Sequence, residues 1–128
     1  MEKTPGISQA EWQVMKVLWW QSPLTATEVY EALEESTGWH AKTVRTLLGR
    51  LVAKGVVKRE KRAGSFRFWP VLDEATCVGE ESRTFLERCF SGRLGPMLAH
   101  FIENEDLTPD DVRSLRALLD ERDGEDEA

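Results

Sequence analysis

Residues 39–69 read WHAKTVRTLLGRLVAKGVVKREKRAGSFRFW and form a strongly basic segment inside an acidic chain. Nine of its side chains are basic and only Glu60 is acidic, so the segment has a net charge of +8, whereas the whole chain has a net charge of −6. Neutralising phosphates with basic side chains releases condensed counterions, and this release drives binding to a polyanion. The stretch therefore predicts a surface that contacts nucleic acid.

Apolar residues at helical spacing occupy the first half of this stretch and predict a helix over 41–53 with one apolar face. The residues that point away from that face are Lys42, Thr46, Gly49 and Arg50. Two strands are predicted at about 56–61 and 66–70, joined by a turn at 63–65. A helix with a short basic outer face, followed by a basic hairpin, is the outline of a recognition helix and a wing.

Two further helices are predicted upstream, over about 9–20 and 26–36. Each begins with a capping box, in which a hydroxyl residue precedes a glutamate by three positions: Ser8 with Glu11, and Thr25 with Glu28. The order of three helices and a hairpin within residues 1–70 predicts a winged helix-turn-helix domain.

The remainder of the chain is acidic and is predicted to be helical, so the fold class is mainly α. Residues 71–128 hold six basic and sixteen acidic side chains, and helices are predicted over about 73–90, 93–104 and 109–122. Their apolar stripes exceed what three short helices bury among themselves, which predicts a helical dimerisation domain over 71–122. Residues 123–128 are nearly all acidic and are predicted to be disordered. The predicted dimer contacts are Phe85, Leu86, Phe90, Leu94, Met97, Leu98, Phe101, Ile102, Val112, Leu115, Leu118 and Leu119.

Several side chains of the basic stretch suit contact with DNA, although each also has an ordinary structural explanation. Thr43 and Thr46 can reach base edges, because a threonine hydroxyl donates or accepts and its methyl packs on thymine. Arg62 and Arg67 flank the hairpin turn and could reach phosphates, or could protect a sheet edge from aggregation. Trp39 could contact the sugar-phosphate backbone, or could seal the core between the second and third helices.

Other functional classes lack a supporting motif. The chain has no signal-peptide pattern and no apolar run long enough to span a bilayer, which favours a cytoplasmic protein. Cys77 and Cys89 suit buried thiols, and neither His40 nor His100 has a partner at metal-ligand spacing. No phosphate-binding loop or catalytic motif is present, so we expect neither an enzyme nor a bound cofactor.

Several segments together resemble the penicillinase-repressor family of bacterial winged-helix regulators (the BlaI/MecI type). The opening helix resembles that family from Ile7 to Met15 and at Trp19, and the recognition helix resembles it from Trp39 to Leu47 and at Arg50-Leu51 and Lys54-Gly55. Ser91-Gly92 and the run from Phe101 to Leu107 resemble its dimerisation region. The resemblance covers the chain from Ile7 to about Leu119.

The resemblance implies a homodimer that binds double-stranded DNA at an inverted-repeat operator and represses transcription, with β-lactam-resistance-type genes as targets. It implies that Lys42, Thr43 and Thr46 read bases. The implied backbone contacts are Trp39, Arg45, Arg50 and, in the wing, Arg62, Ser65 and Arg67.

The resemblance also implies induction by a membrane sensor protease system. Members of the family are cleaved at an Asn-Phe bond, where this chain has His100-Phe101. The family opens the recognition helix with Ser-Pro, where this chain has His40-Ala41, and the cysteine cluster of copper-responsive members is absent here. Two other interpretations stay open: a ligand-responsive winged-helix regulator of another family, and a winged helix used as a protein-interaction module.

Overall fold

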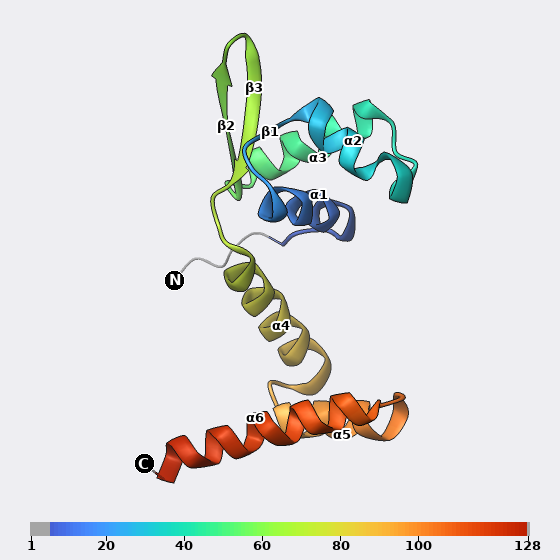
Figure 1. The fold of residues 1–128 in the computed structure, drawn as a ribbon, viewed down its shortest axis with the longest axis vertical. Helices are drawn as coiled ribbons and strands as arrows, with labels where there is room; N and C mark the ends of the chain where they lie inside the picture. The colour runs from blue at the N-terminus through green and yellow to red at the C-terminus, as the bar shows by residue number, and fades with distance from the viewer. Residues whose placement is uncertain (1–5, 128) are drawn as a thin grey trace. The chain divides into compact units, whose positions relative to one another are not determined.

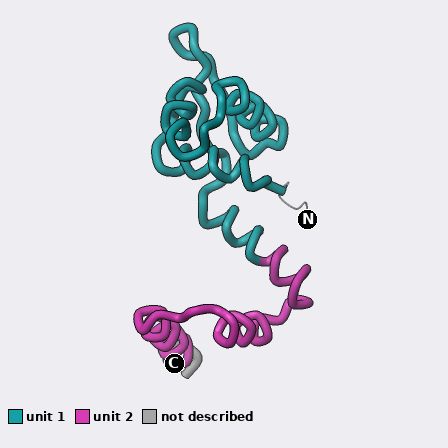
Figure 2. Tube along the Cα trace, turned by 90° about the vertical axis from the view of Figure 1, so that its right-hand side faces the viewer, with its two compact units in different colours: residues 1–82 teal, residues 83–128 magenta. Residues whose placement is uncertain are grey.

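The computed structural model describes residues 6–127, with side chains through residue 124, and contains six helices and three strands in that range (Figure 1). The chain forms two compact units, the first ending at Ser82 and the second beginning at Arg83 (Figure 2). The sequence places the boundary at Pro70, and the structure places it later. The indole Nε1 of Trp19 donates to the carbonyl oxygen of Leu72 at 2.9 Å, and Cys77 is buried, so the residues after the wing belong to the first unit.

The capping boxes predicted from the sequence form as expected. Helices α1 (Gln9–Trp20) and α2 (Ala26–Thr37) begin after Ser8 and Thr25, and in both boxes the hydroxyl and the glutamate satisfy each other's backbone N–H. Helix α6 (Pro109–Glu127) begins in the same way, because Thr108 Oγ1 accepts from the Asp111 N–H at 3.0 Å. These pairings satisfy backbone donors that a helix start otherwise leaves free.

Helix α3 (Ala41–Ala53) lacks this device, since its N-cap His40 makes no side-chain cap hydrogen bond. Its start is held instead by the preceding residue, the half-buried Trp39, which packs against the core. Figure 1 shows α1, α2 and α3 packed together beside the hairpin. The inner face of α3 consists of Val44, Leu47, Leu48 and Leu51, all buried as its periodicity predicts.

The predicted hairpin is present as β2 (Val57–Arg62) and β3 (Ser65–Pro70), which pair antiparallel. Arg62 opposes Ser65, so the turn consists of Ala63 and Gly64, both at positive φ (51° and 83°). Positive φ at both central residues matches the right-handed twist of the flanking strands, and glycine adopts it without strain.

A third strand, β1 (Leu24–Thr25), is absent from the prediction. It pairs antiparallel with β3 and gives the sheet order β1-β3-β2. A strand of two residues is too short to show the alternation of apolar and polar side chains by which strands are predicted. β1 is therefore recognised only through its pairing with β3. The pairing ties the start of α2 to the base of the wing.

The second unit contains the end of α4 (Glu74–Phe90), then α5 (Leu94–Asn104) and α6. No side chain from residue 83 to residue 124 is buried. The expected disorder after residue 122 differs from the structure, in which α6 continues to Glu127. After a helix has started, extending it by one residue forms one more backbone hydrogen bond and orders only that residue. This low cost accounts for the continuation of α6 through the acidic residues. Cys89 also differs from expectation, because its side chain is exposed.

Candidate nucleic-acid interface

The outward face of α3 brings the three predicted base-reading residues together. Lys42, Thr43 and Thr46 line one shallow hollow with Arg50, and all four side chains are exposed. Thr46 Oγ1 donates to the carbonyl oxygen of Lys42 at 3.0 Å, which uses its one hydrogen and leaves its acceptor lone pairs free on an exposed side chain. A face of this kind can enter a major groove and contact base edges.

The predicted backbone contacts of α3 separate into two places. Arg50 lies in the hollow with the base-reading residues, whereas Arg45 lines a different groove, between α3 and the wing. That groove also contains Thr27 and Arg59, which the sequence reasoning did not select as contacts. The strand alternation alone could have placed Arg59 on the same side of the sheet as Phe68, which it opposes.

The wing arginines have partners of their own. Arg62 pairs with Glu60 at 3.2 Å, and Arg67 lies 3.6 Å from the Glu28 carboxylate in the capping box of α2. Arg67 therefore holds the base of the wing to α2. The hydrogen bonds from Thr25 and the Arg67 charge keep the pKa of Glu28 below its ordinary value. Ser65 is exposed beside the turn, where a phosphate could reach it.

A tryptophan orders two cations on one face of the wing. Lys58 Nζ lies 4.8 Å from the centroid of the Trp69 ring, and the guanidinium carbon of Arg62 lies 5.2 Å from it. A cation over an indole ring is stabilised by about 0.5–1 kcal/mol at an exposed site. Trp69 therefore holds both cations near the wing rather than leaving them free in solvent.

We expect Trp69→Leu to destabilise the first unit by about 1–2 kcal/mol, because two cation–π contacts and part of the ring's burial are lost. The melting temperature, followed by circular dichroism, falls by roughly 5 °C or more. Trp20→Leu is the matched control, since Trp20 is 79% exposed. An equal fall in both variants contradicts the assigned role of Trp69.

Trp39 packs against the core and keeps part of its side chain exposed. It is half-buried, packs against the buried cluster, and its backbone N–H donates to Thr37 Oγ1 at 3.2 Å. The structure shows the packing of Trp39 against the core, and its contact with the DNA backbone stays a prediction.

An ion pair between Glu11, in the first turn of α1, and Lys54, at the C-terminal end of α3, connects these two helices. Glu11 is 1% exposed, and its Oε1 lies 2.5 Å from Lys54 Nζ, which also donates to the carbonyl oxygen of Gly6 at 2.8 Å. Burial raises the pKa of Glu11, but hydrogen bonds from Lys54 and Ser8 outweigh that effect and lower the pKa below its ordinary value. The pair joins the start of α1 to the residue that ends α3.

The second unit presents the apolar residues that were predicted to form a dimer contact. Their most exposed members are Leu94, Ile102, Leu118 and Leu119, at 54–62%. The others in the predicted set are exposed or half-buried: Phe85, Leu86, Phe90, Met97, Leu98, Phe101, Val112 and Leu115. His100 and Phe101, the predicted cleavage point, lie within α5. The centroid of the His100 ring lies 5.8 Å from that of Phe101 and 6.0 Å from that of Phe90.

Among the described residues, no group of three or more His, Cys, Asp or Glu side chains could hold a metal ion. In the same part of the chain, none of the helices combines the length and apolar character that crossing a bilayer requires.

Three packed helices, a hairpin wing and an exposed basic face on the third helix define the class of winged-helix DNA-binding proteins. The sequence model of the penicillinase repressor family matches residues 7–121, and the chain belongs to this family. The chain is 36% identical to the penicillinase repressor of Bacillus licheniformis over 121 residues, which cover 94% of both chains. It is 32% identical to the methicillin resistance regulatory protein MecI of Staphylococcus aureus over 120 residues, covering 94% of this chain and 98% of MecI.

Solved structures agree with this assignment. The DNA-binding domain of the repressor BlaI matches 59% of this chain and 92% of its own, with 40% identity and a TM-score of 0.52. The monomeric form of Bacillus licheniformis BlaI in complex with the blaP half-operator matches equally well in coverage, with a TM-score of 0.51. MarR from E. coli, at 21% identity and a TM-score of 0.51 over 90% of this chain and 76% of its own, shares the fold. The predicted family and the mainly α winged-helix fold are confirmed, and the protein is a DNA-binding transcriptional repressor.

Proposed function

We propose that this protein represses transcription as a homodimer bound to an inverted-repeat operator. The observation that carries the proposal is the exposed hollow on α3, where Lys42, Thr43, Thr46 and Arg50 converge. Two hydroxyls and an ammonium read base edges there, and Arg50 contacts the flanking phosphate. Arg45, Arg62 and Ser65 hold the backbone at the sides.

The dimer part of the proposal rests on the second unit. Its four most exposed leucine and isoleucine side chains, Leu94, Ile102, Leu118 and Leu119, lie on α5 and α6, and no side chain of that unit is buried up to residue 124, where the described side chains end. Isolated helices with this much open apolar surface gain by packing against a partner. A second copy of the chain is the most common such partner and matches the symmetry of an inverted repeat.

The regulated genes are proposed from the relatives. Those relatives are named for penicillinase repression and methicillin resistance, so genes of β-lactam resistance are the proposed targets. The proposal includes no catalytic activity and no cofactor, and it places the protein in the cytoplasm, where it meets chromosomal DNA.

Induction by a membrane sensor protease, with cleavage between His100 and Phe101, is the proposed route of release. Both side chains are exposed, which supports access. The bond lies within α5, however, and a protease needs an opened backbone. Cleavage therefore requires local unfolding of α5, and the rate of cleavage would follow the population of that open form.

Selection from a randomised palindromic library, followed by sequencing, tests the proposal at two salt concentrations. We expect an enriched inverted repeat whose binding weakens steeply as salt rises, since each neutralised phosphate contributes about −0.9 to the slope of log K against log salt. If no repeat is enriched, or if binding does not depend on salt, the operator proposal is wrong and a protein-interaction module is favoured.

Single substitutions on α3 separate base reading from backbone contact. We expect Lys42→Ala and Thr46→Ala to weaken operator binding by about 1–3 kcal/mol and to weaken non-specific binding less. Arg50→Ala should weaken both alike and reduce the salt slope by about 1. Fluorescence anisotropy with operator and scrambled DNA measures both affinities.

Two exposed residues of the second unit provide matched controls for these substitutions: Thr84→Ala for Thr46→Ala, and Arg116→Ala for Arg50→Ala. Neither control should change DNA affinity. If Thr46→Ala lowers affinity equally for operator and scrambled DNA, Thr46 is not a base reader.

A further inference from the structure

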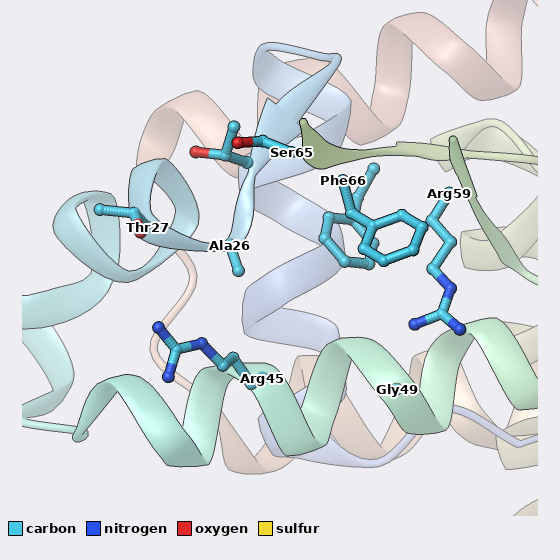
Figure 3. A pocket seen from close by; sticks show the side chains of 9 residues that line it. Ala26, Thr27, Arg45, Gly49, Arg59, Ser65 and Phe66 are labelled. Atoms are coloured by element: carbon cyan, nitrogen blue, oxygen red, sulfur yellow. The ribbon is translucent and has the colours of Figure 1, made fainter. Parts of the chain in front are cut away.

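The groove between α3 and the wing is a separate concave feature of the first unit, with a volume of about 350 Å³. Arg45 and Gly49 contribute from α3, Arg59 from β2, Phe66 from β3 and Thr27 from α2. Figure 3 shows Arg45 and Arg59 at opposite ends of it, with Arg45 directed toward Thr27 and Ala26, and with Arg59 beside Phe66 and above Gly49 on the helix. Volumes of this size are typical of small-molecule sites.

The groove is positively charged and lacks a compensating acid. Its lining contains two arginines and no Asp or Glu. Neither Arg45 nor Arg59 forms an ion pair with another residue in the described part of the chain. An arginine fork binds a carboxylate or a phosphate through two parallel hydrogen bonds, so the groove favours an anionic group.

The rest of the lining combines apolar side chains with the hydroxyl groups of Thr25, Thr27 and Ser65. Phe66 is 44% exposed, Phe68 and Ala26 complete the wall, and a Cβ added at Gly49 would meet no atom within 4 Å. The guanidinium carbon of Arg59 lies 4.7 Å from the centroid of the Phe66 ring, which holds that arginine in place. A bare phosphate would leave these surfaces unused, whereas a planar apolar body can stack on a ring or a guanidinium.

We propose that this groove binds a small planar aromatic acid, whose anionic group pairs with Arg59 while its ring packs beside Phe66. The effect on DNA rests on the proposed function, in which Arg45 contacts the operator backbone. Because Arg45 lines the same groove, a bound ligand occupies space that the operator backbone needs there, and the ligand and the operator compete. The apparent operator Kd therefore rises in proportion to 1 + [ligand]/Kd of the ligand.

Calorimetric titration of the full-length protein with 2-naphthoate tests the binding step. At a typical ligand efficiency, about 13 non-hydrogen atoms give a Kd on the order of 1 mM. We expect saturable binding in this range, and binding at least tenfold weaker for 2-naphthamide, which is neutral, and for inorganic phosphate, which has no ring.

Two variants locate the ligand. Gly49→Leu fills the groove without a clash from its Cβ, and Arg59→Gln removes one charge, so each should weaken 2-naphthoate binding at least tenfold. Ala53→Leu is the matched control, because it adds the same side chain at an exposed position of α3 outside the groove. It should leave binding unchanged, and circular dichroism confirms that each variant is folded.

Each other outcome overturns the proposal. No saturable binding removes the site, and unchanged binding by Gly49→Leu places the ligand elsewhere. Equal binding of inorganic phosphate by the wild type reduces the groove to a site for a simple anion such as a DNA phosphate. The titration contains no DNA, so a failed operator selection leaves this test of the groove intact, and a failed titration leaves the operator proposal intact.

Discussion

Ile102→Asp is expected to produce a monomer whose affinity for an inverted-repeat operator is lower by about two orders of magnitude or more. Ile102 is 54% exposed on α5 and belongs to the stripe proposed to meet a second copy. A carboxylate there must lose its hydration for the contact to form, which is costly without a partner charge. Each DNA-binding unit then engages its half-site alone and loses the gain from linked binding.

Sedimentation equilibrium and DNA binding together test this prediction. Affinity for a single half-site should match that of the wild type, because the α3 surface is untouched. Ala99→Asp provides the control, since it adds the same charge at an exposed position of α5 outside the predicted stripe. Full-strength operator binding by a demonstrably monomeric Ile102→Asp protein would falsify the dimer proposal.

Lys54→Met is expected to lower the free energy of unfolding by about 3 kcal/mol, because it leaves the buried Glu11 carboxylate without its charge partner. Lys54 keeps a 31% exposed side chain, so some solvent screening remains and the effect falls at the lower end of the usual range. Lys16→Met is the matched control. Its pair with Glu74 spans 3.5 Å between half-exposed side chains, and such a pair contributes less than about 1 kcal/mol.

The pH dependence of unfolding gives a second measure of the same pair. The folded-state pKa of Glu11 lies below its ordinary value of 4.5, so its contribution is complete above that value and is lost as pH falls through the folded-state pKa. In Lys54→Met, burial dominates and raises the pKa of Glu11 instead. The stability deficit of the variant should therefore shrink as the pH is lowered. A deficit of equal size at pH 7 and pH 4, measured by urea unfolding, would contradict the assigned ion pair.

The elements that the sequence predicted best are those controlled by neighbours in the chain. Ser8 and Glu11 are three residues apart, and so are Thr25 and Glu28, so a motif of four consecutive residues predicts each helix start. The buried side of α3 follows equally directly from its periodicity. In the candidate site, Lys42 and Thr46 share a face for the same reason, because residues four apart on a helix lie one above the other.

The elements that the sequence missed depend on distant partners. Strand β1 is two residues long and exists through its pairing with β3. Glu11 reads as half of a capping box, and its second role with Lys54 joins residues that are 43 positions apart. The groove was not foreseen, because Arg45 and Arg59 lie on a helix and a strand whose relative placement is set by core packing.

Local sequence signals were enough to predict where three of the helices begin, which face of α3 is buried, and that a basic segment lies in an acidic chain. They were enough because hydrogen bonds and side-chain facing within a few residues depend on local order alone. The packing of separate elements was needed to show that Trp39 packs against the core, that Arg67 holds the wing to Glu28, and that Arg45 and Arg59 line one groove. These outcomes depend on how separate elements pack, and spacing along the chain does not encode the distance between such elements.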